Sequence, residues 1–225
     1  MANIFIIVEG QTEEQFYKRL VQNEFRNEDG SYRHYFQVVV MPSKRNVYSR
    51  QNKGGAFSFD VCLDNIHRFL RQASHCDLVL LTLDYYGLHD SFKQFLPSQP
   101  SALEDKILAV QGRLEDEIGS QRFKFRLQVH EFEAYLFSNP ATVVSHFQEP
   151  MKLPILQEIL SKFGNNPELI NDDPATAPSK RLGAIFPNFG KTTDGIAIAD
   201  KTGIAHIRQR CAWFDSMCKL VEDLP

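Results

Sequence analysis

The sequence lacks the features that define several common classes of protein. Its four cysteines form no C-x-x-C pair and show no spacing typical of a zinc site or a disulfide framework, so we interpret them as reduced, mostly packed thiols. No apolar run approaches the length of a membrane span, and no basic leader precedes the first apolar segment. We therefore expect a cytoplasmic protein with no membrane partner.

A strong charge of one sign and a nucleotide-binding glycine loop are also missing. The net charge is -3 and the pI is near 6.2, which excludes a protein that coats nucleic acid by bulk charge but allows a local basic groove. No Walker-type loop is present, so any dependence on ATP would come from a partner. The oligomeric state is left open.

Strand and helix patterns alternate over the first two thirds of the chain. Strands are predicted at residues 4–8, 35–40, 77–83 and 123–129, and helices from residue 12 onward, at 57–73 and at 102–118. The alternation predicts an α/β fold with a mainly parallel sheet flanked by helices. We divide the chain into an α/β core, residues 1–139, and an α-helical C-terminal extension, residues 140–225, that packs on the core and ends in a helix over 204–224.

Acidic residues follow three of the predicted strands, namely Glu9, Asp84, and Glu131 with Glu133. Ligands bind at the carboxyl ends of parallel strands, so we expect these side chains to meet. Carboxylates that lie this close together repel one another unless a cation neutralises them or some of them are protonated. Oxygen ligands suit Mg²⁺ or Mn²⁺, and such ions assist phosphodiester cleavage. The four acids are therefore the predicted metal ligands and catalytic residues.

Each of these positions also has a structural interpretation. An acid after a strand is commonly a helix N-cap or a solvated loop residue. Glu9 is the strongest functional candidate, because Gly10 permits a tight turn beside it and the next helix has its own capping signal, a predicted Thr12–Gln15 capping box. His130 is either a metal ligand or general base, or simply a hydrogen-bonding residue at a strand end.

Lys180 and Arg181 are the predicted partners of a phosphate. They begin a helical stretch after a proline-rich turn, so they would place two positive groups near a helix N-terminus. The alternative is a surface pair that caps the helix or bridges to Asp172 and Asp173.

Two further groups of charged residues have an open interpretation. The segment 43–53 carries Lys44, Arg45, Arg50 and Lys53 around Tyr48, which is suited to nucleic-acid contact and also typical of a solvated loop. Lys191 and Asp194 are predicted to form a structural ion pair, with a catalytic role for the lysine as the alternative.

Residues 8–13, Val-Glu-Gly-Gln-Thr-Glu, resemble the opening motif of Toprim domains, which topoisomerases, primases and nucleases of the overcoming-lysogenisation-defect group share. In those proteins a glutamate after the first strand and an Asp-x-Asp after the third hold the metal. Here Asp84 matches the first aspartate, but Tyr86 stands at the second. A tyrosine keeps its proton at neutral pH and cannot replace a carboxylate as an Mg²⁺ ligand. Either Glu131 or Glu133 supplies the ligand, or the site binds metal weakly or not at all.

A closer similarity covers nearly the whole chain, which resembles bacterial domain-of-unknown-function family 4276, Toprim-like proteins often encoded beside an ATPase. Five motifs carry it, at residues 8–13, 84–87, 130–134, 178–181 and 191–195. By this resemblance the tyrosine at 86 is normal, and the chain is expected to be a metal-dependent phosphodiesterase or nuclease acting on DNA or RNA, the effector of a bacterial defence system with a partner ATPase. The alternatives are a non-catalytic Toprim-fold module that binds a protein or nucleic acid, and a phosphatase or nucleotide hydrolase.

Overall fold

The computed structural model describes residues 1–42, 57–99, 101–170 and 174–224, so the basic segment at 43–53 lies wholly outside the described residues. Within these ranges, parallel strands form one sheet in the order β2-β1-β3-β4. The strands are β1 (Ala2–Val8), β2 (His34–Val40), β3 (Leu78–Asp84) and β4 (Phe123–Gln128). The predicted α/β fold with a parallel sheet flanked by helices is confirmed, and the strands lie within two residues of their expected ends.

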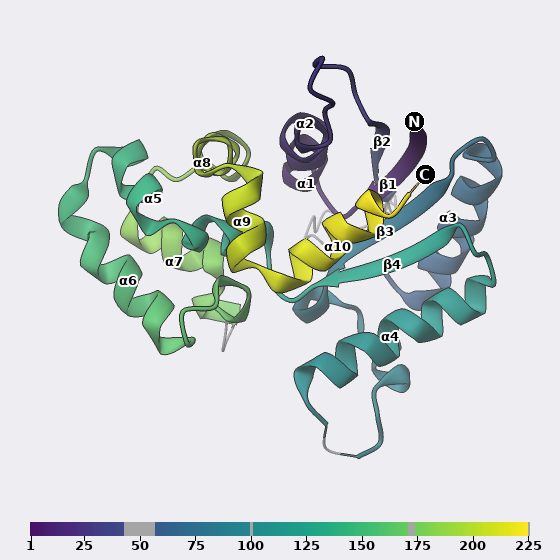
Figure 1. The fold of residues 1–225 in the computed structure, drawn as a ribbon. Coiled ribbons are helices and arrows are strands. Elements are labelled where there is room, and N and C mark those ends of the chain that lie inside the picture. Colours follow the sequence, from purple (N-terminus) through teal and green to yellow (C-terminus); the bar gives the residue numbers. More distant parts are fainter. Residues whose placement is uncertain (43–56, 100, 171–173, 225) are drawn as a thin grey trace, which may run out of the picture.

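Helices cover both faces of the sheet, and a further group of helices from the second half of the chain lies to one side of it (Figure 1). They are α1 (Gln11–Phe16), α2 (Gln22–Glu24), α3 (Phe59–Gln72), α4 (Leu103–Ile118), α5 (Pro140–Phe147), α6 (Leu153–Lys162), α7 (Pro178–Ile185), α8 (Ile196–Thr202), α9 (Ile204–Arg210) and α10 (Ala212–Glu222). A π-helical turn joins α1 to α2.

Two hydrophobic cores lie on opposite faces of the sheet. Along β1, Ile4 and Ile6 belong to one core, whereas Phe5 and Ile7 belong to the other, which α3 and α4 cover. Burial on both faces explains why the strands read as continuous apolar runs instead of alternating ones. The first core also contains side chains of α1, α5 and α10, so the C-terminal helices pack on the same face as the helix that follows β1.

The single helix predicted over 204–224 is wrong, because the chain breaks at Cys211 (φ −126°, ψ 89°) between α9 and α10. The buried carboxylate of Glu168 accepts hydrogen bonds from the backbone N–H groups of Trp213 (3.0 Å) and Phe214 (2.9 Å) and so fixes the start of α10. The apolar spacing continues across the break, and Cys211 itself is buried, which is why the sequence pattern did not reveal it.

The cysteines and the lengths of the described helices bear on two of the expectations from the sequence. The thiols of Cys62, Cys76, Cys211 and Cys218 are free and buried, as a packing role requires. None of the described helices combines the length and the apolar character needed to cross a bilayer.

Candidate active site at the carboxyl edge of the sheet

The predicted acids meet at the carboxyl ends of three neighbouring strands. Glu9 follows β1, Asp84 ends β3, and Glu131 and Glu133 follow β4. Burial raises the pKa of Asp84 well above its usual value, and repulsion from Glu9, Glu13, Glu131 and Glu133 adds to the rise. The structure therefore brings together the four carboxylates expected from the sequence and adds Glu13 to them.

The turn after β1 explains how Glu13 enters the site. Gly10 is the N-cap of α1, and the Glu13 carboxylate folds back so far that a Cβ on Gly10 would lie 2.9 Å from its Oε2 atom. Burial raises the pKa of Glu13, although backbone hydrogen bonds and Lys191 act against the rise. The predicted Thr12–Gln15 capping box is wrong, because the helix begins earlier, at Gln11.

Glu131 has a structural role besides its place among the acids. Its Oε2 atom accepts a hydrogen bond of 3.1 Å from the backbone N–H of Ser179, in the first turn of α7. A carboxylate is stabilised there by the unpaired N–H groups and the positive end of the helix dipole. The Pro-Ser-Lys-Arg motif at 178–181 thus reaches the site through its backbone.

The side chains of Lys180 and Arg181 are placed differently from each other. Lys180 is exposed on the first turn of α7. Arg181 donates from Nε to the carbonyl oxygen of Thr176 (2.6 Å), and its guanidinium lies 5.5 Å from the centre of the Phe163 ring. The predicted bridge to Asp172 and Asp173 lies outside the described residues.

Lys191 contacts two of the acids directly. Its Nζ atom lies 3.3 Å from Glu133 Oε1 and 3.8 Å from Glu131 Oε2, while 49% of its side chain is exposed. The predicted ion pair between Lys191 and Asp194 is wrong, since Asp194 Oδ1 instead lies 2.8 Å from His146 Nε2. Lys191 therefore belongs to the site, where we had expected a structural role.

The rest of the 191–195 motif holds this lysine in position. Asp194 Oδ2 accepts a hydrogen bond of 2.7 Å from the backbone N–H of Gly190 and closes the turn that carries Lys191. Gly195 lies so close to the buried Phe132 ring that a Cβ would be 3.2 Å from it. Small residues in this turn allow it to approach the segment that carries Glu131 and Glu133.

Glu133 is the acid best suited to exchange a proton near neutral pH. Only 2% of its surface is exposed, and burial raises its pKa to about 7 although Lys191 opposes the rise. Its Oε1 atom lies 3.3 Å from Lys191 Nζ, which is its one charged partner among the described residues. Such a carboxyl group can give or take a proton at the pH of the cell.

An aromatic pair lies beside the acids, where position 86 follows the end of β3. The ring of Tyr86 stacks on His130 with centroids 4.4 Å apart and an angle of 21° between the planes. Burial lowers the pKa of His130 to about 4, so the imidazole is neutral, and its Nδ1 atom has no hydrogen-bond partner among the described residues. The side chain at 86 thus contributes a ring to the site, and no charge.

The donor set fits a hard divalent cation by type but is not closed around one. Carboxylate oxygens are the ligands that Mg²⁺ and Mn²⁺ prefer, and the buried Glu133 Oε1 atom has no directed hydrogen bond. Among the described residues, however, no three histidine, cysteine or acidic side chains are already gathered as a metal site. The acids share an electrostatic environment, and metal binding would require some of them to turn.

The raised pKa of Glu133 predicts how stability depends on pH. Because the folded value, about 7, exceeds the ordinary value of 4.5, the contribution of this group is greatest below pH 4.5 and is lost as the pH rises to about 7. The stability advantage of Glu133→Gln over the natural protein should therefore grow as the pH rises from 5 to 8, by at most about 3 kcal/mol in the free energy of unfolding. Urea unfolding in EDTA at the two pH values measures this, and an equal difference at both would contradict it.

Five segments that are separate in the sequence contribute residues to this site. They are residues 8–13, 84–87, 130–134, 178–181 and 191–195. A family model described as "Domain of unknown function (DUF4276)" matches residues 8–222. No curated protein and no solved structure matches the chain.

Proposed function

Since the chain belongs to the DUF4276 family, whose description names no function, we propose a function from its site, that of a metal-dependent phosphodiesterase of Toprim type that cleaves DNA or RNA. One observation carries the proposal, the presence of five carboxylates at one edge of the sheet, where burial and then repulsion from the other four raise the pKa of Asp84. Like charges this close destabilise a fold, and one lysine does not balance them. A divalent cation would.

Glu9, Asp84, Glu131 and Glu133 are the residues that would hold Mg²⁺ or Mn²⁺. When bound, such an ion activates the attacking oxygen and stabilises the leaving oxygen of a phosphodiester. Glu13 keeps its carboxylate over the Gly10 turn, where its negative charge adds to burial in raising the pKa of Glu9.

Lys191 is the first candidate for contact with the substrate phosphate. Burial lowers its pKa, but attraction to Glu133 and Glu131 outweighs burial and keeps the ammonium group charged. Its half-exposed side chain can move from these acids to a phosphate as a metal takes over their neutralisation. Lys180 and Arg181 remain the candidates for a second phosphate contact, with Lys180 the more exposed.

The wider role that we propose is that of an effector in a bacterial defence system, delivered or restrained by a partner ATPase. Its support is the resemblance of the five motifs to proteins often encoded beside an ATPase, together with the lack of a Walker-type loop in this chain.

The proposal is tested with purified protein, Mn²⁺ or Mg²⁺, and single- and double-stranded DNA and RNA. Glu9→Gln should lower the cleavage rate at least about 100-fold, because it removes one ligand charge without changing the size of the side chain. Glu14→Gln is the matched control, since Glu14 pairs with Lys18 (2.6 Å) outside the cluster and should leave cleavage unchanged. Undiminished cleavage by Glu9→Gln would overturn the site assignment, and activity on small phosphate esters alone would favour a phosphatase.

A second candidate is a non-catalytic module that binds a protein or nucleic acid. It is favoured by the ion pairs of Lys191, which already neutralise part of the cluster, and by the tyrosine at position 86. Calorimetric titration with Mn²⁺ separates the two functions. The enzyme should release or take up heat that Glu9→Gln abolishes, whereas the module should give no heat that depends on Glu9.

A further inference from the structure

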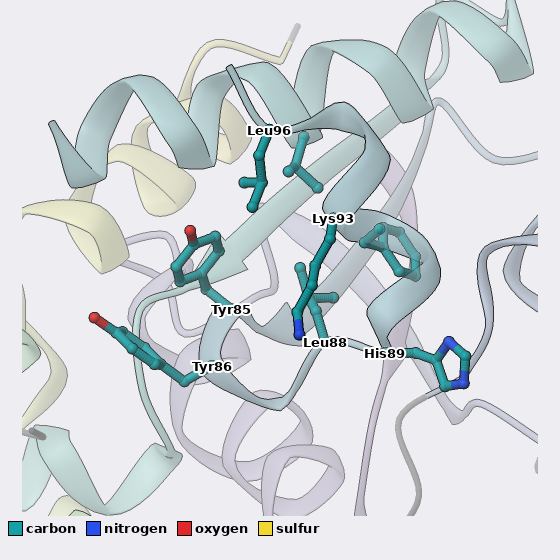
Figure 2. A pocket seen from close by; sticks show the side chains of 8 residues that line it. Tyr85, Tyr86, Leu88, His89, Lys93 and Leu96 are labelled. Atoms are coloured by element: carbon teal, nitrogen blue, oxygen red, sulfur yellow. The ribbon is translucent and has the colours of Figure 1, made fainter. Parts of the chain in front are cut away.

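A small pocket opens directly beside the acids, at the end of β3. It encloses about 200 Å³ and is lined by Tyr85, Tyr86 and four apolar side chains, Leu88, Phe92, Leu96 and Val110. Figure 2 shows the two tyrosines at one end of the pocket with Leu96 close by, and His89 at the opposite end. Tyr86, which lines the pocket, stacks on His130, the residue before Glu131, so the pocket lies next to the segment that carries two of the acids.

The tyrosine rings form a fixed aromatic surface at the mouth of this pocket. Their centroids are 5.3 Å apart and their planes are nearly perpendicular, at 88°. Tyr86 keeps 58% of its surface exposed, although stacking on the buried His130 holds its ring in place. An exposed ring whose orientation is fixed can stack on a planar ligand with little loss of conformational entropy.

The size and the polar groups of the pocket narrow the class of ligand. Pockets that enclose a drug-sized molecule usually measure roughly 300–1,000 Å³, so this one suits a single ring system. The hydroxyl groups of the tyrosines can hydrogen-bond to a heterocycle, and the exposed Lys93, paired only with Asp90 in the described contacts (2.6 Å), supplies a positive charge at the rim. An apolar slot with an aromatic wall and a cation at its rim matches a nucleobase attached to a phosphate.

We propose that this pocket binds one nucleobase of the nucleotide whose phosphate lies at the acids. The inference rests on the proposed phosphodiesterase function and adds a subsite to it. Stacking on Tyr86 would recognise any base by its π-face, so the pocket would position a strand without selecting a sequence. It also gives the aromatic residue at position 86 a role that a second aspartate would not have.

Binding without turnover tests the proposal. Fluorescence anisotropy in EDTA compares a short single-stranded oligonucleotide with an oligonucleotide of the same length that has abasic sugars in place of its nucleotides. The natural protein should bind the base-containing strand about tenfold more tightly, and Tyr86→Ala should remove that difference. Tyr86→Phe keeps the ring and should retain most of it. Tyr35→Ala, which removes an exposed tyrosine on the edge strand β2, is the matched control.

A second variant leaves Tyr86 and its contact with His130 intact. Leu96→Trp should fill the pocket and weaken binding of the base-containing strand by a similar factor, with the abasic strand unaffected. If a nucleoside monophosphate competed as strongly as the oligonucleotide, base binding in the pocket would be supported and its ligand would be a free nucleotide. Equal affinity of the natural protein for the two strands would overturn the proposal. Because no cleavage is measured, this outcome is distinct from undiminished cleavage by Glu9→Gln.

Discussion

Asp84→Asn should abolish metal-dependent cleavage and at the same time make the metal-free protein more stable at pH 8. Burial and the surrounding carboxylates raise the pKa of Asp84, so its charged form destabilises the fold above that pKa. Asparagine has nearly the same shape and no charge to repel. We expect a gain of about 1 kcal/mol or more in the free energy of unfolding, and a loss of cleavage of at least about 100-fold.

The two effects are measured on the same protein preparation. Urea unfolding in EDTA should show a gain that shrinks as the pH falls from 8 toward 5, because the raised pKa makes the folded protein bind the Asp84 proton more tightly than the unfolded chain does, so a fall in pH stabilises the natural protein. Added Mn²⁺ should stabilise the natural protein more than the variant. Asp64→Asn, at an exposed position of α3, is the control and should change neither quantity. A variant less stable than the natural protein at pH 8 would show that burial and repulsion at Asp84 do not destabilise the fold.

Phe132→Ala should cause the largest loss of stability among the substitutions considered. Phe132 stands between Glu131 and Glu133, is 1% exposed, and packs on Phe16 with ring centroids 5.0 Å apart. Removing a fully buried phenylalanine typically costs about 3–5 kcal/mol, a large part of the roughly 5–15 kcal/mol that stabilises a domain. The cavity would also loosen the segment that positions the two acids.

Phe132→Leu is the matched control for this prediction. It keeps most of the apolar volume and should cost less than about 1.5 kcal/mol. Chemical denaturation gives both values. If the free energy of unfolding of the alanine variant were within about 1 kcal/mol of that of the natural protein, the packing of Phe132 on Phe16 would not be what holds the segment with the two acids in place.

The strands and the meeting of the acids could be predicted because both depend on short-range patterns. An apolar run of five to seven residues identifies a buried strand, and the carboxyl ends of neighbouring parallel strands lie at one edge of the sheet. Glu9, Asp84 and Glu131 follow from these two rules alone. The pattern does not give the rotamers of the acids, which decide whether a metal site is closed.

The contributions of Glu13 and Lys191 depended on contacts that sequence spacing does not encode. Glu13 lies in the first turn of α1, and a glutamate three residues after a glycine N-cap signals that its side chain can fold back over the turn. Lys191 lies far from the acids in sequence, and its neighbour Asp194 offered a plausible partner. In the structure Asp194 pairs with His146 of α5, and Lys191 pairs with Glu133 instead.

The turn that carries Lys191 and the first turn of α7 are made late in synthesis, whereas all five acids are made early. A ribosome that has released only the strands and the helices between them therefore exposes carboxylates without the lysine and the backbone N–H that restrain two of them. If the acids cleave nucleic acid, the nascent chain is incomplete as a nuclease until its last third has emerged. Under the proposed function, the order of the motifs along the chain would delay activity in the cell that makes the protein.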